Sequence, residues 1–251
     1  MNTIHKTLVM GIVNVTPDSF SDGGQFFRPE EAVRRAKNLV GEGADIIDLG
    51  AESTRPGATP IDSREEWARL EPVLGKLAGT VAAKISVDTY HPETAAKALA
   101  LGADIINCVY PEPVPEMLRL LEKHRRAELV LPAKTLNLCP VALRDRIYLD
   151  PMIGFGTTRE EDVALLRSIP ELAREGRILI GVSRKRIVRK LMLGDKASGA
   201  ERQLANKVGK LLGANVAVAV WAAMHGASCL RVHDVAETVQ AMNVVRALAD
   251  Q

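Results

Sequence analysis

Residues 43–48 read GADIID, and closely similar segments recur as GADIIN at 102–107 and GASCLR at 226–231. Each follows a stretch with helical spacing of apolar residues, begins with a glycine of the kind that ends helices, and finishes on a polar residue. A strand that is buried along its length and opens at its carboxyl end onto a polar surface has this form. The repeat therefore predicts helix and strand units joined in a parallel sheet.

Eight apolar, β-branched runs of this character lie along the chain, separated by amphipathic segments that we expect to be covering helices. The expected strands cover residues 7–15, 45–50, 84–88, 104–109, 128–133, 147–151, 177–183 and 228–233. Eight such units in 251 residues have the size of a (β/α)8 TIM barrel of the α/β class, formed by a single domain over 1–251. A doubly wound open sheet is the second choice, because its dinucleotide fingerprint GxGxxG is missing after the first strand.

The composition excludes several classes of function. Charged residues make up 25% of the chain and the formal net charge is only +2, which argues against nucleic-acid binding. We expect no membrane span and no signal peptide, and hence a cytoplasmic protein, because no apolar run approaches about 18 residues. The cysteines Cys108, Cys139 and Cys229 are odd in number and lack CxxC spacing, which disfavours a disulfide framework and a structural zinc site.

Polar residues stand at the end of every expected strand. They are Asn14, Asp48 with Glu52 and Thr54, Asp88, Asn107, Lys134, Asp150, Ser183 with Lys185, and Arg231 with His233. A single residue of this kind is usually a helix cap, but the strand ends of a barrel converge on one pocket. Together they predict an active site there.

The chemistry of these residues indicates two neighbouring binding functions. Asp88, Asn107 and Asp150 offer acceptors and an amide to a flat heterocycle that carries ring N–H and amino donors. Arg231 and His233 alternate on the last strand and so share a face, in the region where such barrels hold phosphate. Lys185 adds a positive charge at the start of a helix. We therefore expect an anion beside a heterocycle.

Two polar loops follow the first two strands, VTPDSFSDGG at 15–24 and STRPGATP at 53–60. Both have few apolar anchors, as is typical of loops that close over a substrate and exclude water. Ordinary surface turns are the alternative interpretation.

Seven motifs resemble the dihydropteroate synthase family, in order and over nearly the whole chain: GIVNVTPDSFSDGG, GADIIDLGAESTRPGA, ISVDTY, ADIIN, LDPMIGFG, GVSRK and LRVHDVAE. The resemblance implies a transferase of folate biosynthesis. Such an enzyme condenses 6-hydroxymethyl-7,8-dihydropterin pyrophosphate with p-aminobenzoate, releases pyrophosphate and uses Mg²⁺.

The resemblance also implies a role for each matching residue. The pterin would be bound by Asp88, Asn107, Asp150 and Lys185. Pyrophosphate would be bound by Asn14, Arg231 and His233, with Asn14 also the magnesium ligand. The p-aminobenzoate side would use Phe20, Thr54, Arg55, Pro56, Phe155 and Ser183. The catalytic set would be Asp18, Asp22, Lys185, Arg231 and His233, in which the two aspartates shield the cation left when pyrophosphate departs.

The chain departs from the family pattern around the fourth to sixth strands. The family's IND is here Ile106, Asn107 and Cys108, its MHM is replaced by a run ending in Lys134, and a glycine of DPGIGFGK is Met152. These changes alter the expected floor of the pterin site. They leave two alternatives open: a pterin-binding paralogue without catalysis, and a methyltransferase that uses a methylated pterin. Arg231 and His233 favour the synthase, because neither alternative needs a pyrophosphate pocket.

The connection between the fifth and sixth strands is unusually short. Residues 135–146 include Pro140 and allow only about two helical turns, so the fifth covering helix should be shortened or absent. We expect an exposed apolar strip over these strands, covered by a neighbouring helix or by a second subunit. A homodimer is favoured, and the family resemblance implies one through the helices of the sixth to eighth units.

Overall fold

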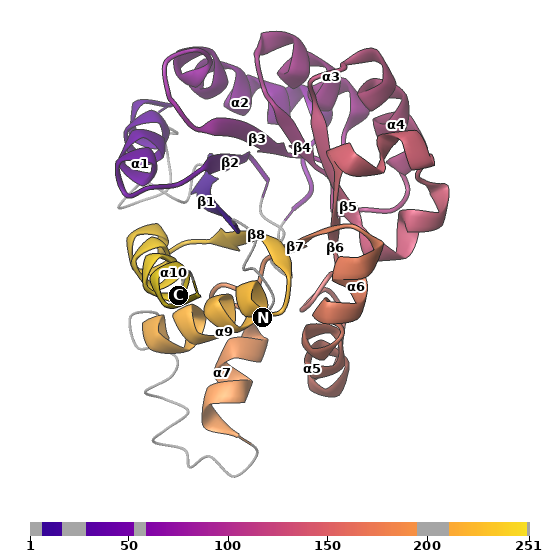
Figure 1. Ribbon diagram of the computed structural model, residues 1–251. Coiled ribbons are helices and arrows are strands. Elements are labelled where there is room, and N and C mark those ends of the chain that lie inside the picture. Colours follow the sequence, from indigo (N-terminus) through magenta and orange to yellow (C-terminus); the bar gives the residue numbers. More distant parts are fainter. Residues whose placement is uncertain (1–6, 17–28, 53–58, 195–210, 250–251) are drawn as a thin grey trace.

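The computed structural model describes residues 7–16, 29–52, 59–194 and 211–249. In these residues eight parallel strands pair in sequence order, and β1 also pairs with β8, so the sheet closes on itself. Figure 1 shows the strands in the centre with the helices outside them. The predicted (β/α)8 TIM barrel is confirmed, and the open sheet is excluded.

The strands fall where the apolar runs placed them. They are β1 (Leu8–Asn14), β2 (Ile46–Gly50), β3 (Lys84–Asp88), β4 (Ile105–Asn107), β5 (Glu128–Pro132), β6 (Ile147–Asp150), β7 (Arg177–Ile180) and β8 (Ala227–Val232). Most end one to three residues before the expected boundary, because the chain leaves the sheet once its side chains reach the barrel mouth formed by the carboxyl ends.

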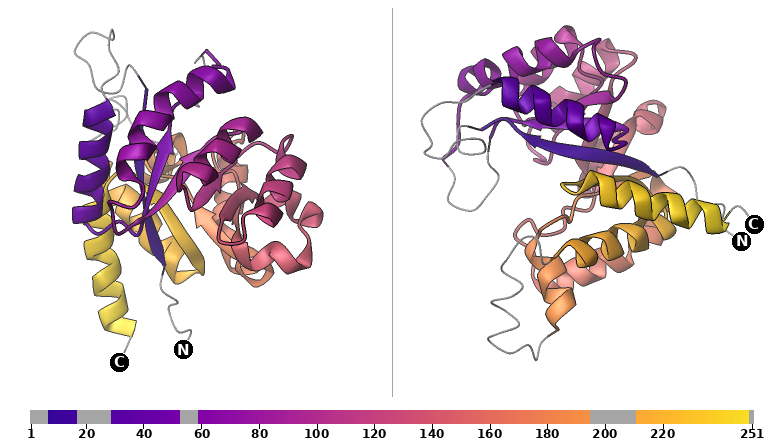
Figure 2. Two further views of the ribbon diagram at one scale, coloured as in Figure 1. Left: turned by 90° about the horizontal axis from the view of Figure 1, so that it is seen from above. Right: turned by 90° about the vertical axis from the view of Figure 1, so that its left-hand side faces the viewer.

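The helices form the outer layer. They are α1 (Pro29–Gly41), α2 (Ser63–Leu77), α3 (Pro92–Leu101), α4 (Val114–Lys123), α5 (Arg159–Arg167), α6 (Ile169–Glu175), α7 (Arg186–Leu193), α9 (Leu212–Met224) and α10 (Val235–Ala249). Figure 2 shows α1 and α10 on either side of β1. Gly11 permits this packing, because a Cβ there would lie only 3.0 Å from side chains of Leu39 and Val235. Among the described residues, no helix is both long and apolar enough to span a bilayer.

The interior of the barrel is filled with side chains. They come from seven strands and are Met10, Ile46, Ile105, Val130, Tyr148, Leu179 and Cys229, all buried. A second and larger core lies between the strands and the helices. Because the interior is packed, a ligand can approach the strand ends only from the barrel mouth.

Two short 3₁₀ helices stand between β5 and β6, η2 (Ala133–Leu138) and η3 (Val141–Arg146), so the predicted loss of the α-helix is confirmed. The expectation that this leaves an apolar strip over the strands is wrong, since Leu129, Leu131 and Leu149 are at most 2% exposed. A 3₁₀ helix rises about 2 Å per residue, so six residues extend further than the same number in an α-helix.

Side chains of η3 also bind it to the end of α4 and hold it against the barrel. The Arg146 guanidinium donates to the carbonyl oxygens of Leu121 and His124, both at 3.0 Å, and to that of Ala127 at 3.3 Å. Leu143 packs inward at 9% exposure. The chain thus covers β5 and β6 by itself, and a second subunit is not needed for this purpose.

Candidate active site

The predicted heterocycle residues line a single pocket at the barrel mouth. Its lining comprises Asp88, Asn107, Val109, Asp150, Phe155, Gly181, Lys185 and Arg231. These residues come from β3, β4, β6 and β8 and from the segments that follow β4, β6 and β7. Both signs of charge therefore meet in one place, as the strand ends predict.

Arg231 lies in the centre of the pocket's hydrogen-bond network. Its Nε donates to Asp48 Oδ2 at 2.6 Å and its Nη2 donates to Asp88 Oδ2 at 2.7 Å. Burial disfavours the charge, but the carboxylates of Asp48 and Asp88 outweigh this effect and raise the pKa of Arg231 above its ordinary value. The guanidinium is thus held in place as a permanent cation.

Asp48 was predicted only as one of the polar strand-end residues, with no particular partner, and it belongs to this hydrogen-bond network. It is fully buried, and its Oδ2 accepts a second hydrogen bond from Asn107 Nδ2 at 3.2 Å. The sequence repeat already indicated that Asp48 and Asn107 have equivalent places, because they are the last residues of GADIID and GADIIN. Asn107 Oδ1 is buried without a partner among the described residues, so a ligand N–H would satisfy it.

Burial shifts the pKa values of the ionisable residues in the pocket. It raises the pKa of Asp88 to about 7, against the opposing charge of Arg231 and with support from Asp48, Glu66 and Asp150. It also raises the pKa of Asp150, although the charge of Lys185 opposes the shift. The same desolvation lowers the pKa of Lys185 to about 8, with Asp150 acting in the other direction.

The turn after β6 positions the ammonium of Lys185. Lys185 Nζ donates to the carbonyl oxygen of Ile153 at 2.8 Å and lies 4.1 Å from the centre of the Phe155 ring. Met152 N donates to Asp150 Oδ1 at 2.7 Å, which orients that carboxylate. Met152 has φ of 65°, a left-handed conformation that glycine adopts most easily.

His233 lies at the carboxyl end of β8 against the end of β7. Ser183 Oγ is 3.1 Å from His233 Nδ1 and accepts from the His233 backbone N–H at 3.2 Å. Arg35 Nη2 donates to the His233 carbonyl oxygen at 3.2 Å. Ser183 thus supports His233 at the barrel mouth, and its expected contact with p-aminobenzoate stays a prediction.

Lys134 does not belong to the pocket. β5 ends at Pro132, so Lys134 falls in the first turn of η2, where it is exposed. Its expected position at a strand end is therefore wrong, because Pro132 cannot continue the ladder and starts the 3₁₀ helix.

Six residues of the predicted set lie outside the described part of the chain: Asp18, Phe20, Asp22, Thr54, Arg55 and Pro56. Asn14 is described and stands exposed at the carboxyl end of β1. Its side-chain amide offers an oxygen, which is the ligand atom that Mg²⁺ prefers. A single protein ligand of this type fits Mg²⁺, because this ion keeps several waters and bridges to substrate phosphates.

Comparisons with known proteins agree with this fold and site. The family model of the pterin binding enzymes matches residues 10–137 and 133–233. Dihydropteroate synthase of Neisseria meningitidis serogroup B is 37% identical over 98% of this chain and 94% of that protein. The solved structure of the Xanthomonas albilineans dihydropteroate synthase with 4-aminobenzoic acid has a TM-score of 0.84 at 38% identity, over 98% of this chain and 94% of that one. The same enzyme has been solved in complex with 7,8-dihydropteroate, at 34% identity and a TM-score of 0.80 over 98% and 95%.

The barrel and the pocket at its mouth thus define a pterin-binding enzyme of the (β/α)8 class. Within that class the chain belongs to the dihydropteroate synthase family, whose members are transferases of folate biosynthesis.

Proposed function

We propose that this chain joins 6-hydroxymethyl-7,8-dihydropterin pyrophosphate to p-aminobenzoate, forming dihydropteroate and releasing pyrophosphate. The observation that carries the proposal is the position of Arg231, which is bonded to Asp48 and Asp88 in the pocket that also contains Asn107 and Asp150. The Arg231 guanidinium is therefore placed both beside the acceptors that suit a heterocycle and where it can bind the phosphate groups of the same substrate.

The pterin is held by residues of opposite hydrogen-bonding character. Asp88, Asp150 and the free oxygen of Asn107 accept hydrogen bonds from its amino and ring N–H groups, while Lys185 donates to its carbonyl oxygen. Because the carboxylates are buried, a ligand that satisfies them is favoured over one that leaves them unpaired.

The departing pyrophosphate is stabilised by positive charge at the end of β8. Arg231 uses one hydrogen of Nε and one of Nη2 for Asp48 and Asp88, so three of its five donor hydrogens remain for the phosphate oxygens. His233 adds a donor on the same strand end. Mg²⁺ bound at Asn14 would neutralise further negative charge on the leaving group.

The carbon–oxygen bond to pyrophosphate then breaks before the new bond forms, and the electron-rich pterin carries the positive charge. The amine of p-aminobenzoate attacks that carbon and loses a proton. The p-aminobenzoate side is assigned to Phe20, Thr54, Arg55, Pro56, Phe155 and Ser183. Asp18 and Asp22 are assigned to shielding the cation.

Release of pyrophosphate tests the proposed reaction. With both substrates and Mg²⁺ present, the protein should release one pyrophosphate for each dihydropteroate, and p-aminobenzoate should be required for sustained release. A pterin-binding protein without catalysis, or a methyltransferase, would bind pterin in calorimetry and release no pyrophosphate.

We also propose that the chain acts as one domain in a cytoplasmic homodimer. Free thiols at all three cysteines are typical of a reducing compartment. Met224 of α9 and Val244 and Leu248 of α10 are 56%, 61% and 71% exposed, which supports an interface on the helices of the seventh and eighth units. Light scattering coupled to size exclusion should give twice the mass of the chain, and a stable monomer would reject the dimer.

A further inference from the structure

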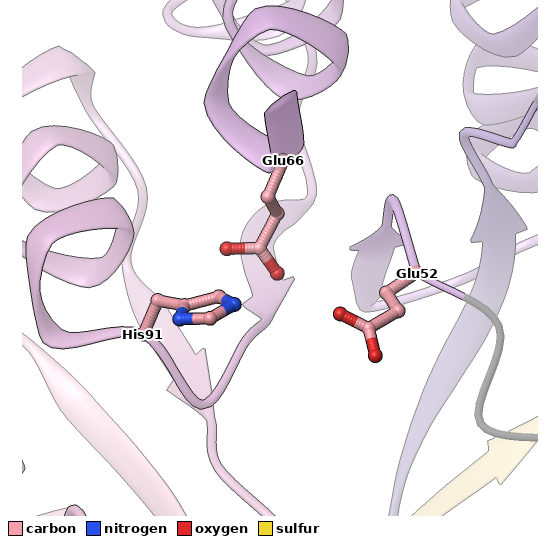
Figure 3. Close-up of side chains that lie close together, drawn as sticks. All are labelled: Glu52, Glu66 and His91. Carbon is pink, nitrogen blue, oxygen red and sulfur yellow. The ribbon is translucent and has the colours of Figure 1, made fainter. Parts of the chain in front are cut away.

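A cluster of potential metal ligands lies beside the pterin pocket. Glu52 follows β2, Glu66 stands in the first turn of α2, and His91 precedes α3. One ligand atom of each residue lies within 4.8 Å of the others. Figure 3 shows the two carboxylates and the imidazole ring around a common space. None of the three residues belongs to the substrate sets assigned above.

Glu66 has an incomplete set of partners. It is fully buried, and its Oε2 accepts a hydrogen bond from Thr89 Oγ1 at 2.7 Å. Its Oε1 is buried without a geometric hydrogen-bond partner among the described residues, and the nearby Thr94 hydroxyl, which donates to the Ser63 carbonyl oxygen at 3.4 Å, also stabilises the ionised carboxylate. The carboxylate points into the space between Glu52 and His91. A buried carboxylate oxygen without a hydrogen-bond partner destabilises the folded protein unless a cation or a proton interacts with it.

The other two members are held in position by their neighbours. His91 Nε2, the ring nitrogen that faces the two carboxylates in Figure 3, lies 3.1 Å from the Ile61 carbonyl oxygen, and this contact holds the ring in place. Binding of a cation through Nε2 would move the proton of the neutral ring to Nδ1. The Tyr90 hydroxyl lies 3.1 and 3.0 Å from the two oxygens of Glu52 and donates to one at a time, which leaves the other available.

We propose that Glu52, Glu66 and His91 bind one divalent transition-metal ion of the Zn²⁺ or Mn²⁺ type. An imidazole with two carboxylates suits these ions better than it suits Mg²⁺. Bonds of about 2.0–2.2 Å require the ligand atoms to approach one another, and rotation of the half-buried Glu52 side chain provides this movement. A small pocket lined by residues including Glu52, Glu66 and Asp88 lies beside the cluster and shares Asp88 and Val109 with the pterin pocket.

The ion would have a structural role at one side of the mouth. It would link the end of β2 to α2 and to the start of α3, and Thr89, which bonds Glu66, directly follows Asp88. The site differs from the magnesium position assigned to Asn14, which lies on β1, where waters and pyrophosphate would supply the remaining ligands.

Calorimetry with Zn²⁺ on the chelator-treated protein tests the site, without substrates because pyrophosphate itself binds metal. One equivalent should bind, and bound ion should raise the melting temperature. Glu66→Gln and His91→Asn should each weaken this binding at least about tenfold. His124→Asn removes a histidine at the end of α4 and should leave the affinity unchanged. Co²⁺ in place of Zn²⁺ should give a visible spectrum that both site variants lose.

Two results would overturn the site. One is the absence of a saturable equivalent, which would mean that a proton on Glu66 or a charged His91 satisfies the buried carboxylate instead. The other is equal affinity in the wild type and in His91→Asn. Because His91 is partly exposed and asparagine is favourable before a helix, this variant should fold even if Glu66→Gln does not.

Discussion

Arg231 and His233 share a strand end but not the same surroundings. Arg231 is bonded to Asp48 and Asp88, whereas His233 contacts Ser183 at the neighbouring strand end. Removing Arg231 leaves buried carboxylates without their cation, which is strongly unfavourable. Removing the His233 side chain leaves the pterin acceptors intact. The two residues should therefore respond differently to substitution.

We expect His233→Ala to lower turnover by about a hundredfold, the usual effect of losing one donor to a developing anion. Its affinity for an unphosphorylated pterin should change less than about twofold. Arg231→Ala should lose turnover, pterin affinity and stability together. Steady-state kinetics, calorimetry and urea unfolding measure these effects. Equal losses of turnover and pterin affinity in His233→Ala would place that residue in the heterocycle site instead.

Pterin affinity should depend on pH on both sides of a narrow optimum. Asp88 accepts most strongly from the ligand when it is ionised, and since its pKa is raised to about 7, affinity should fall as the pH decreases below that value. Lys185 donates most strongly when it is charged, and its pKa of about 8 predicts weaker binding at higher pH. Calorimetry between pH 5.5 and 9 would be the measurement, over a range of about three and a half units around these values.

The matched variant for this experiment is Asp88→Asn. It should bind pterin about 1–3 kcal/mol more weakly near neutral pH and lack most of the decrease on the acidic side. Retention of that decrease in Asp88→Asn would assign the titration to another group.

At the scale of single elements, the turn after β6 places a residue with a side chain in a backbone conformation that favours glycine. Met152 adopts φ of 65°, where a side chain costs about 1–2 kcal/mol relative to glycine. Met152→Gly and Met152→Ala both remove the side-chain contacts, but only glycine relieves the strain. We expect the glycine variant to be about 1 kcal/mol more stable to urea unfolding than the alanine variant, after the entropy of the unfolded glycine is included. Greater stability of the alanine variant would show that the turn is unstrained.

The two 3₁₀ helices replace a full helix only if their few buried side chains carry the packing. Leu143 of η3 is 9% exposed, whereas Val141 of the same helix is 78% exposed. Leu143→Ala should lower the free energy of unfolding by about 2–3 kcal/mol, and Val141→Ala should change it by less than about 0.5 kcal/mol. Chemical denaturation measures both, and similar small effects would mean that η3 does not cover β5 and β6.

Across the whole molecule, most of the fold could be predicted because buried parallel strands have a simple sequence pattern. The runs around Ile46, Ile105 and Leu179 are apolar on both faces, and each ends where the barrel mouth begins. The short fifth connection was also predictable from its length. Its ability to cover β5 and β6 was not, because that depends on the greater rise of 3₁₀ helices and on the contacts of Arg146 with α4.

The site was predictable where several strand ends converge and less so where a residue acts through another. Asp88, Asn107 and Asp150 meet in one pocket, as expected from their positions at the ends of strands. Asp48 was present in the same pattern, but a single carboxylate at a strand end usually caps a helix, and only the structure shows it bonded to Arg231. The roles assigned to Asp18, Phe20, Asp22, Thr54, Arg55 and Pro56 stay predictions.

The central claim is that this barrel makes dihydropteroate, and the most direct test is chromatographic detection of that product. The purified protein, supplied with the pterin pyrophosphate, p-aminobenzoate and Mg²⁺, should form dihydropteroate and pyrophosphate in equal amounts over many turnovers. Asp88→Asn and His233→Ala should reduce both products in parallel. Binding of the pterin with no dihydropteroate above the rate without protein would contradict the account.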